Sequence, residues 1–297
     1  MHLPTLRQLE FLCAVSDEGS FSRAAEVCHV TQPTLSSAIK EIENLLGLQL
    51  VERQTRGTAM TAAGEAAVAR ARIILSDAAD LVAAAQQAGA PLTGSFRLGA
   101  IPTIAPFLLP RTVKALHSAY TKLKLYLRED QTDRLVEALK ARELDAALIA
   151  LPWDMNGINT ESLGDDEFML VAPTGHRLLQ GRQLETSDLS EETILLLEDG
   201  HCLRDHAIAI CHLPKGRNAT DVTATSLPTL VQMVAGGLGV SLLPRLAVEG
   251  GITSGADVAM RAFSTPLIGR RLGLAWRKGS PREEEVKLVT QIIRQVL

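Results

Sequence analysis

Two cysteines and three histidines gather in one short stretch of the sequence, GHCLRDHAIAICH. Cys202 and Cys211 are nine positions apart, and His201, His206 and His212 stand beside or between them. Thiolate and imidazole groups bind transition metals, and a thiol is also readily oxidised. Three interpretations therefore compete: a metal site, a pair of ordinary buried thiols, and a pair that reacts.

The spacing of these residues disfavours a metal. Zinc sites usually bring their cysteines as close pairs such as CxxC, and the stretch has no such pair. We therefore expect no metal and no other cofactor. Inert thiols remain the default alternative, because free cysteine is among the most buried residue types.

The reactive interpretation rests on the place of Cys202. The preceding Glu-Asp-Gly is typical of a strand end and a turn, so we expect Cys202 at or just before the start of a helix. Unpaired N–H groups and the helix dipole favour a thiolate there, with Arg204 adding positive charge and His201 a donor. One continuous helix would hold Cys202 and Cys211 about 13 Å apart, whereas disulfide Cα atoms rarely exceed about 7 Å. Forming the bond would therefore unwind or bend the segment, as a switch requires.

Length and composition indicate a protein of several domains. The chain has 297 residues, of which 46% are hydrophobic and 22% charged, as in ordinary globular proteins. Its first residues make a poor signal peptide, and no run resembles the ~20 apolar residues of a membrane span. We expect a cytoplasmic protein with no membrane partner, in which thiols are reduced by default. Cys13 and Cys28 are predicted to be core residues.

The segment EGSFSRAAEVCHVTQPTLSSAIKEIENLLG predicts two short helices joined by a tight turn. Ser20 can cap a helix that runs to Cys28. Thr31 can cap the next helix, with Pro33 in its first turn, where a missing N–H costs nothing. The pattern is typical of a helix-turn-helix whose second helix reads DNA.

The two faces of that second helix differ. Its apolar positions recur at helical spacing, namely Leu35, Ile39, Ile42, Leu45 and Leu46. The opposite face carries short polar groups suited to base edges and phosphates, and the following turn adds two arginines where a wing would meet the DNA backbone. The predicted DNA-binding residues are Ser22, Arg23, Thr31, Gln32, Pro33, Thr34, Ser36, Ser37, Lys40, Arg53 and Arg56.

Net charge gives no support to DNA binding. The whole chain carries −4, and residues 1–60 contain five Lys and Arg against seven Asp and Glu. The hypothesis therefore depends on local clustering of Lys40, Arg53 and Arg56. For the pattern alone, a helical hairpin with a solvated polar face remains the alternative.

Residues 61–90 contain 13 alanines and no proline, which predicts one long helix followed by a hinge at GAPLTG. Its larger apolar residues fall near heptad spacing, which favours pairing with a second helix. They are Val68, Ile74, Leu75, Leu81 and Val82. Packing on its own domain is the alternative.

Beyond the hinge, strand-like and helical patterns alternate to the end of the chain. The predicted strands are SFRLGAI, KLKLYLR, DAALIAL, EFMLVAP, TILLLED, DVTAT, GVSLLP and RRLGLAW. Helices are expected at 106–120, at 132–142 with Thr132 as N-cap, at 226–235 and from Pro281 onwards. The alternation indicates parallel sheets with covered faces, and two sheets fit this length better than one.

The motifs GSFSRAAE, VTQPTLS and IKEIENLLG, in register from Phe11 to Gly47, resemble the DNA-binding domain of LysR-type transcriptional regulators. Val51 and Met60 depart conservatively from the family pattern. The resemblance covers the whole chain and implies an α plus α/β protein. Its parts are a winged helix-turn-helix (1–60), a dimerisation helix and hinge (61–90) and a two-lobed regulatory domain (91–297) like periplasmic binding proteins. Lobe I is expected at 95–165 plus 268–297, and lobe II at 166–267.

The family resemblance also implies partners. Such regulators bind double-stranded promoter DNA as dimers paired through the long helix, usually assembled into a homotetramer that is a dimer of dimers. RNA polymerase is a further expected partner.

Within this family, GHCLRD with a cysteine nine residues after the first resembles the hydrogen-peroxide sensors. The resemblance implies a peroxidatic Cys202, a resolving Cys211 and a disulfide between them that a glutaredoxin or thioredoxin system reduces. An arginine of RRLGL also contributes in the family, and we choose Arg270 over Arg271. The implied peroxide-binding residues are Thr103, Thr132, His201, Cys202, Arg204, Asp205 and Arg270.

Two alternatives stay open. The protein could be a LysR-type regulator that binds a small organic effector between its lobes, with incidental cysteines. It could also be a thiol peroxidase or disulfide oxidoreductase, but the absent CxxC and the DNA-reading segment argue against an enzyme.

Overall fold

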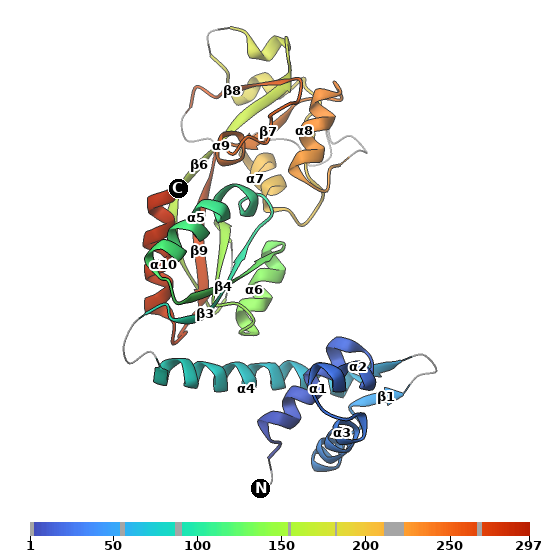
Figure 1. The fold of residues 1–297 in the computed structure, drawn as a ribbon. Helices are drawn as coiled ribbons and strands as arrows, with labels where there is room; N and C mark the ends of the chain where they lie inside the picture. Colours follow the sequence, from blue (N-terminus) through green and yellow to red (C-terminus); the bar gives the residue numbers. More distant parts are fainter. Residues whose placement is uncertain are drawn as a thin grey trace. The chain divides into compact units, whose positions relative to one another are not determined.

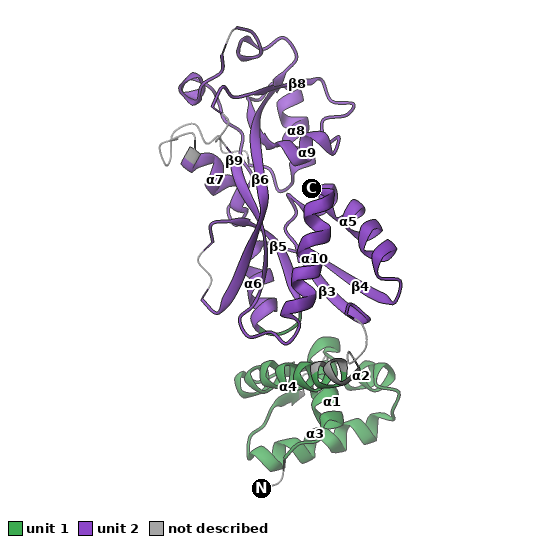
Figure 2. Ribbon diagram, turned by 90° about the vertical axis from the view of Figure 1, so that its left-hand side faces the viewer, with its two compact units in different colours: residues 1–90, 141–143 green, residues 91–140, 144–297 purple. Residues whose placement is uncertain are grey.

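The computed structural model describes residues 3–53, 57–86, 91–153, 156–181, 183–210, 223–265 and 269–297. The chain divides into two compact units, residues 1–90 with 141–143 and residues 91–140 with 144–297, coloured green and purple in Figure 2. No helix in the described ranges is long and apolar enough to cross a membrane.

The first unit is a winged helix-turn-helix followed by a long helix (Figure 1). Its elements are α1 (Leu6–Glu18), α2 (Phe21–Val27), α3 (Gln32–Leu46), the antiparallel wing strands β1 (Val51–Arg53) and β2 (Thr58–Met60), and α4 (Ala62–Gln86). Thr5, Ser20 and Thr31 each cap a helix by accepting a hydrogen bond from the N–H three residues later. These local signals explain why the sequence predicted the helix pair.

The core of this unit is formed by α1, α2, α3 and the first half of α4, and it includes Cys13 and Cys28. Ile42 is the last residue of α3 in that core. Leu45 and Leu46 are 40% and 46% exposed. The prediction that they belong to the buried apolar face of α3 was therefore wrong, because the last turn of the helix extends beyond the core.

The two halves of α4 have different surroundings. Val68 is buried against the helix-turn-helix, as is Ala71. Further along, Ile74, Leu81 and Val82 are 46%, 71% and 54% exposed. The first half therefore packs on its own unit, and the second half presents the apolar surface that helix pairing would require.

The second unit contains a mixed sheet with helices around it. Its elements are β3 (Gly94–Ala100), α5 (Ala105–Ala119), β4 (Leu123–Glu129), α6 (Thr132–Lys140), β5 (Ala146–Leu151), β6 (Ile158–Pro173), 3-10 helices at Arg177–Leu179 and Thr186–Leu189, α7 (Cys202–Ile210), α8 (Leu227–Ala235), β7 (Ser241–Pro244), α9 (Arg245–Glu249), β8 (Val258–Ala262), β9 (Gly269–Arg277) and α10 (Glu283–Val296). In the described part of the chain the strand order is β4-β3-β5-β9-β6-β7, and β8 also pairs with β6.

The prediction of two parallel sheets was wrong. Only β3 pairs in parallel, with β4 and β5, whereas β5–β9, β9–β6, β6–β7 and β6–β8 are antiparallel among the named strands. The cause is β6, which is 16 residues long. It pairs with β9 along its first half and with β7 and β8 along its second, so one strand joins two regions that the sequence suggested were separate.

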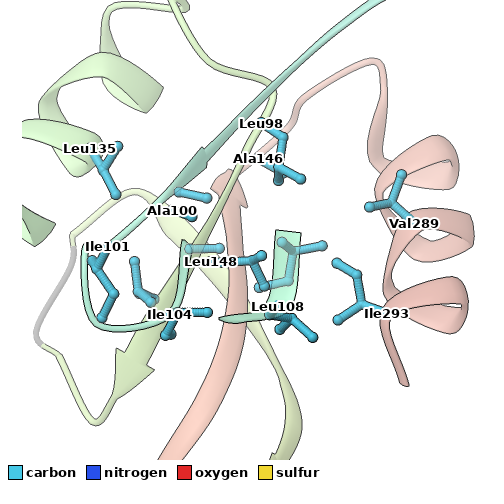
Figure 3. Packing of buried hydrophobic residues seen from close by; sticks show 14 of the residues in the cluster. Leu98, Ala100, Ile101, Ile104, Leu108, Leu135, Ala146, Leu148, Val289 and Ile293 are labelled. Atoms are coloured by element: carbon cyan, nitrogen blue, oxygen red, sulfur yellow. The ribbon is translucent and has the colours of Figure 1, made fainter. Parts of the chain in front are cut away.

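Two hydrophobic cores lie along this sheet. Figure 3 shows the first, where residues of β3 and β5 such as Leu98 and Leu148 meet Leu108 of α5 and Ile293 of α10. The second gathers the end of β6 with β7, α8 and α9. We call these regions lobe I and lobe II. Cys202 belongs to the lobe I core, although its neighbour Leu203 belongs to the lobe II core.

Some predicted elements differ from those observed. TILLLED and DVTAT were predicted strands, but the described residues form only the isolated bridges Ile194–Val240 and Leu197–Ala224. The first half of β6, β8 and α9 were missed. The N-cap of α6 is Gln131, whose carbonyl accepts from Leu135 N, because the helix already begins at Thr132.

Candidate redox site and nucleic-acid interface

Cys202 is the first residue of α7, as the sequence predicted. Gly200, two residues before Cys202, has φ +93°. A Cβ at Gly200 would lie 3.0 Å from Oε1 of Gln131. Glycine meets both demands, because it tolerates positive φ and has no Cβ. This close approach brings the start of α7 against the start of α6, where Thr132 follows Gln131.

The Cys202 thiol is 3% exposed, and its surroundings oppose ionisation. Burial raises the pKa of the thiol above its usual value. The positive charge of Arg270, a polar contact with the Thr132 hydroxyl and the Leu203 N–H lower that pKa by smaller amounts, and Asp205 raises it. The sequence argument that a helix start favours the thiolate was therefore wrong in its net direction. The N–H effect exists, but desolvation outweighs it.

Arg270 is the cation of the site. Its side chain is fully buried, and its Nε and Nη2 lie 3.0 and 2.9 Å from Oδ2 of Asp166. Nη1 donates to Oγ1 of Thr103 at 2.6 Å, and Nη2 to the Thr103 carbonyl at 3.0 Å. The neighbouring Arg271 is exposed and pairs with exposed Asp165. The geometry therefore favours Arg270 over Arg271 as the arginine beside the thiol.

The two threonines of the predicted site have different environments. Thr103 is 2% exposed, and its hydroxyl is occupied by Arg270. Thr132 is 1% exposed. Apart from its polar contact with Cys202, its Oγ1 has no hydrogen-bond partner in the described residues. A buried hydroxyl without a partner is costly, and here it is available to a molecule that reaches the thiol.

Arg204 does not provide the predicted charge beside the thiol. Its Nη1 donates to the Leu197 carbonyl at 3.2 Å, and its Nε lies 2.9 Å from Oδ1 of Asp199. Arg204 therefore stabilises the loop before α7. Asp205 is exposed, and it raises the pKa of Cys202. His201 is 8% exposed, and its Nε2 is 3.9 Å from Oε1 of Glu198.

Cys211 lies outside the described residues, as does His212, so the predicted disulfide remains a prediction. Among the described residues no group of three or more histidine, cysteine or carboxylate side chains is arranged to hold a metal ion.

Sequence reasoning missed two residues of this site. Asp166 pairs with Arg270, and its Oδ1 also accepts the Leu246 N–H at 2.9 Å. His206 lines a cavity of about 830 Å³ together with Arg270, Trp153 and residues of β6. The helical spacing of Cys202 and His206 was visible in the sequence, whereas nothing there indicated the partner of Arg270.

The predicted DNA-reading face lies on the surface of the first unit. Ser22, Arg23, Thr31, Gln32, Pro33, Thr34, Ser37 and Lys40 are exposed, and Ser36 is half-buried. Thr31 and Thr34 hydroxyls lie 2.8 Å apart at the helix start, and Arg23 lies 3.7 Å from Glu18. Arg53 ends β1, and Arg56 lies outside the described residues. The exposed polar face of α3 next to a wing suits insertion into a DNA groove.

Comparisons with known proteins agree with this architecture. A family model described as bacterial regulatory helix-turn-helix protein, lysR family, matches residues 6–65, and one described as LysR substrate binding domain matches residues 89–297.

Relatives and solved structures extend the match to the full chain. The HTH-type transcriptional regulator EstR of Acinetobacter baylyi is 38% identical over 295 residues, which cover 99% of this chain and 97% of the relative. A probable hydrogen peroxide-inducible genes activator of Streptomyces viridosporus is 39% identical over 295 residues, covering 99% and 95%. The structure of a cysteine-to-aspartate variant of full-length OxyR from Pseudomonas aeruginosa matches with a TM-score of 0.79 and 34% identity, covering 99% of both chains. The predicted family is thereby confirmed: this chain belongs to the LysR family of bacterial helix-turn-helix regulators.

Proposed function

We propose that this protein is a transcriptional regulator, not an enzyme, that senses hydrogen peroxide through Cys202 and Cys211 and controls oxidative-stress genes. The observation that carries the proposal is the buried Cys202 thiol, which faces a cationic Arg270 and a Thr132 hydroxyl without another partner. Together these groups offer a small polar oxidant a nucleophile, a positive charge and a hydrogen-bonding group. The name of the Streptomyces relative, a probable hydrogen peroxide-inducible genes activator, and the H2O2-bound structure of a Corynebacterium glutamicum OxyR variant, which is 35% identical, support hydrogen peroxide as the oxidant.

The proposed chemistry occurs in two balanced steps. The sulfur of Cys202 loses its proton and attacks one oxygen of the peroxide, the O–O bond breaks, and the other oxygen leaves as water. The sulfenic acid of Cys202 then condenses with the Cys211 thiol, releasing a second water and forming the disulfide. In this proposal Arg270 stabilises the attacking thiolate, and the Thr132 hydroxyl and the His201 imidazole bind the peroxide.

The output follows from the position of α7. Cys202 packs in lobe I while Leu203 and Ala207 pack in lobe II. We infer that drawing Cys202 towards Cys211 repacks this boundary, shifts the subunits of a homotetramer and changes the spacing of the α3 helices on promoter DNA. Glutaredoxin or thioredoxin in the cytoplasm would reduce the Cys202–Cys211 disulfide and return the protein to its dithiol form. RNA polymerase would be the partner that responds to the change on the promoter.

The test is a thiol map of the reduced full-length protein after substoichiometric peroxide. We expect mass spectrometry to find one intramolecular Cys202–Cys211 disulfide and unmodified Cys13 and Cys28, which are buried in the first unit. The variant Cys202→Ser should keep promoter affinity and lose the peroxide-dependent change in the DNA footprint. Cys28→Ala is the matched control and should keep both. A Cys202→Ser variant that still responds would refute the proposal.

A second candidate function has specific support. The name of the relative EstR makes no reference to peroxide. The cavity of about 830 Å³ beside α7 is also large enough to hold a small organic molecule. Under that alternative the thiols are incidental, and peroxide leaves Cys202 reduced at concentrations that do not oxidise the other cysteines.

A further inference from the structure

His206 lies one helical turn after Cys202 on α7. Residues four apart on a helix share a face, with their Cβ atoms about 5–6 Å apart. Arg270 lines the same cavity as His206, and its positive charge lowers the pKa of both His206 and Cys202. The Nδ1 atom of His206 is buried and has no hydrogen-bond partner within the described residues.

The proposed reaction needs a proton acceptor at this place. Burial keeps the resting Cys202 thiol protonated, because its pKa is raised, yet only the thiolate attacks peroxide. The other candidate bases nearby have other partners or roles, or are exposed. The Nε2 atom of His201 is 3.9 Å from Oε1 of Glu198, and His201 binds the peroxide in the proposed function. Asp166 is held by Arg270 and by the Leu246 N–H. Asp205 is exposed.

Building on the proposed function, we propose that His206 receives the Cys202 proton when peroxide binds and returns it to the departing oxygen. The imidazole takes the thiol proton, directly or through a water in the cavity that His206 lines. The thiolate then forms the S–O bond as the O–O bond breaks, and the leaving hydroxide recovers the proton from the imidazolium. Sulfur is oxidised, peroxide is reduced to water, and His206 ends neutral.

The charges around His206 suit a neutral resting base. Arg270 and Arg271 face the cavity from β9, Asp165 and Glu167 face it from β6, and Asp205 neighbours His206 on α7. Burial, followed by Arg270, lowers the pKa of His206 below its usual value, and Asp205 opposes them. The imidazole is therefore unprotonated at neutral pH. It loses its capacity to accept a proton only when the pH falls through that lowered pKa.

The test measures the rate at which reduced full-length protein loses its Cys202 thiol to peroxide, over a range of pH. We expect His206→Gln to slow oxidation by about 100-fold near neutral pH, the lower range of general acid–base catalysis. The two rates should converge at alkaline pH, where hydroxide already generates the thiolate. The wild-type rate should change little between the pKa of His206 and that of Cys202 and should fall below the pKa of His206. The rate of the variant should instead fall continuously as the pH decreases, without an inflection at the pKa of His206. His117→Gln, an exposed histidine of α5, is the matched control and should match the wild type throughout.

A second variant separates proton transfer from packing. In His206→Ala, added imidazole can enter the open cavity of about 830 Å³ and should restore part of the neutral-pH rate. Rescue is not expected of a side chain that only fills space. Equal rates for His206→Gln and wild type at every pH would overturn the proposal, as would slowing that is uniform in pH with no imidazole rescue. If wild-type Cys202 itself resists peroxide, the proposed function fails instead.

Discussion

Replacing Asp166 with asparagine separates the stability of the site from its reactivity. The change keeps the size of the side chain and leaves an oxygen to accept the Leu246 N–H, but it removes the charge that compensates Arg270. Arg270 and Asp166 side chains are 0% and 3% exposed. Removing one partner of a buried pair costs about 3–5 kcal/mol. We expect about 3 kcal/mol, because Thr103 still accepts two hydrogen bonds from the guanidinium.

The neighbouring Asp165→Asn is the matched control. Asp165 and its partner Arg271 are 69% and 60% exposed, and exposed pairs contribute less than about 1 kcal/mol. Both tryptophans, Trp153 and Trp276, lie in the second unit. Tryptophan fluorescence during urea unfolding of the full chain therefore reports the unit that contains the mutations.

The same substitution should make Cys202 more acidic. With Asp166 uncharged, the positive charge of Arg270 acts on the thiol without compensation, so the pKa of Cys202 should fall relative to wild type. The pH dependence of Cys202 alkylation measures this directly. A less stable protein with a more acidic thiol is the expected combination. A loss of unfolding free energy no larger than that of Asp165→Asn, with an unchanged thiol pKa, would refute this account of Arg270.

Further outcomes follow from other side chains. Thr132→Val removes the hydroxyl that lowers the Cys202 pKa, so alkylation of Cys202 should shift to higher pH. Because that pKa is raised in the folded protein, the associated stability is present below the usual thiol value of 9.0 and is lost as pH rises through the folded value. Urea midpoints should thus fall at alkaline pH and fall less in Cys202→Ala. Lys40→Ala on the exposed face of α3 should weaken DNA binding and reduce the salt slope by about 1 if Lys40 contacts a phosphate. Leu81→Glu, at a side chain that is 71% exposed, should leave unfolding of the chain unchanged and weaken dimers measured by sedimentation.

The helix-turn-helix was predictable because its determinants are local. Ser20, Thr31 and Gly47 mark helix ends by capping and by positive φ, and they act within a few residues. The first half of β6 was not predictable in this way. Its sequence INTESLGDD has few apolar residues, and it becomes a strand by pairing with β9, more than 90 residues further on.

The candidate site likewise combines residues that the sequence indicated with features that depend on distant parts of the chain. Residue identities and spacing indicated Cys202, Thr132 and Arg270, partly through family resemblance, and the structure brings these three together. The direction of the thiol pKa could not be read from the sequence, because it depends on how completely two lobes bury the first turn of α7. Asp166 was missed for a related reason. A partner 104 positions away leaves no local pattern.

The first turn of α7 contributes to two hydrophobic cores at once, through Cys202 on one side and Leu203 and Ala207 on the other. In the proposed switch, this packing favours the dithiol over the disulfide. For every ~1.4 kcal/mol by which the packing of α7 stabilises the dithiol form relative to the disulfide, the reduction potential of the cysteine pair would rise by about 30 mV. Apolar side chains that never touch an oxidant would in this way set how oxidising the surroundings must become before the regulator responds.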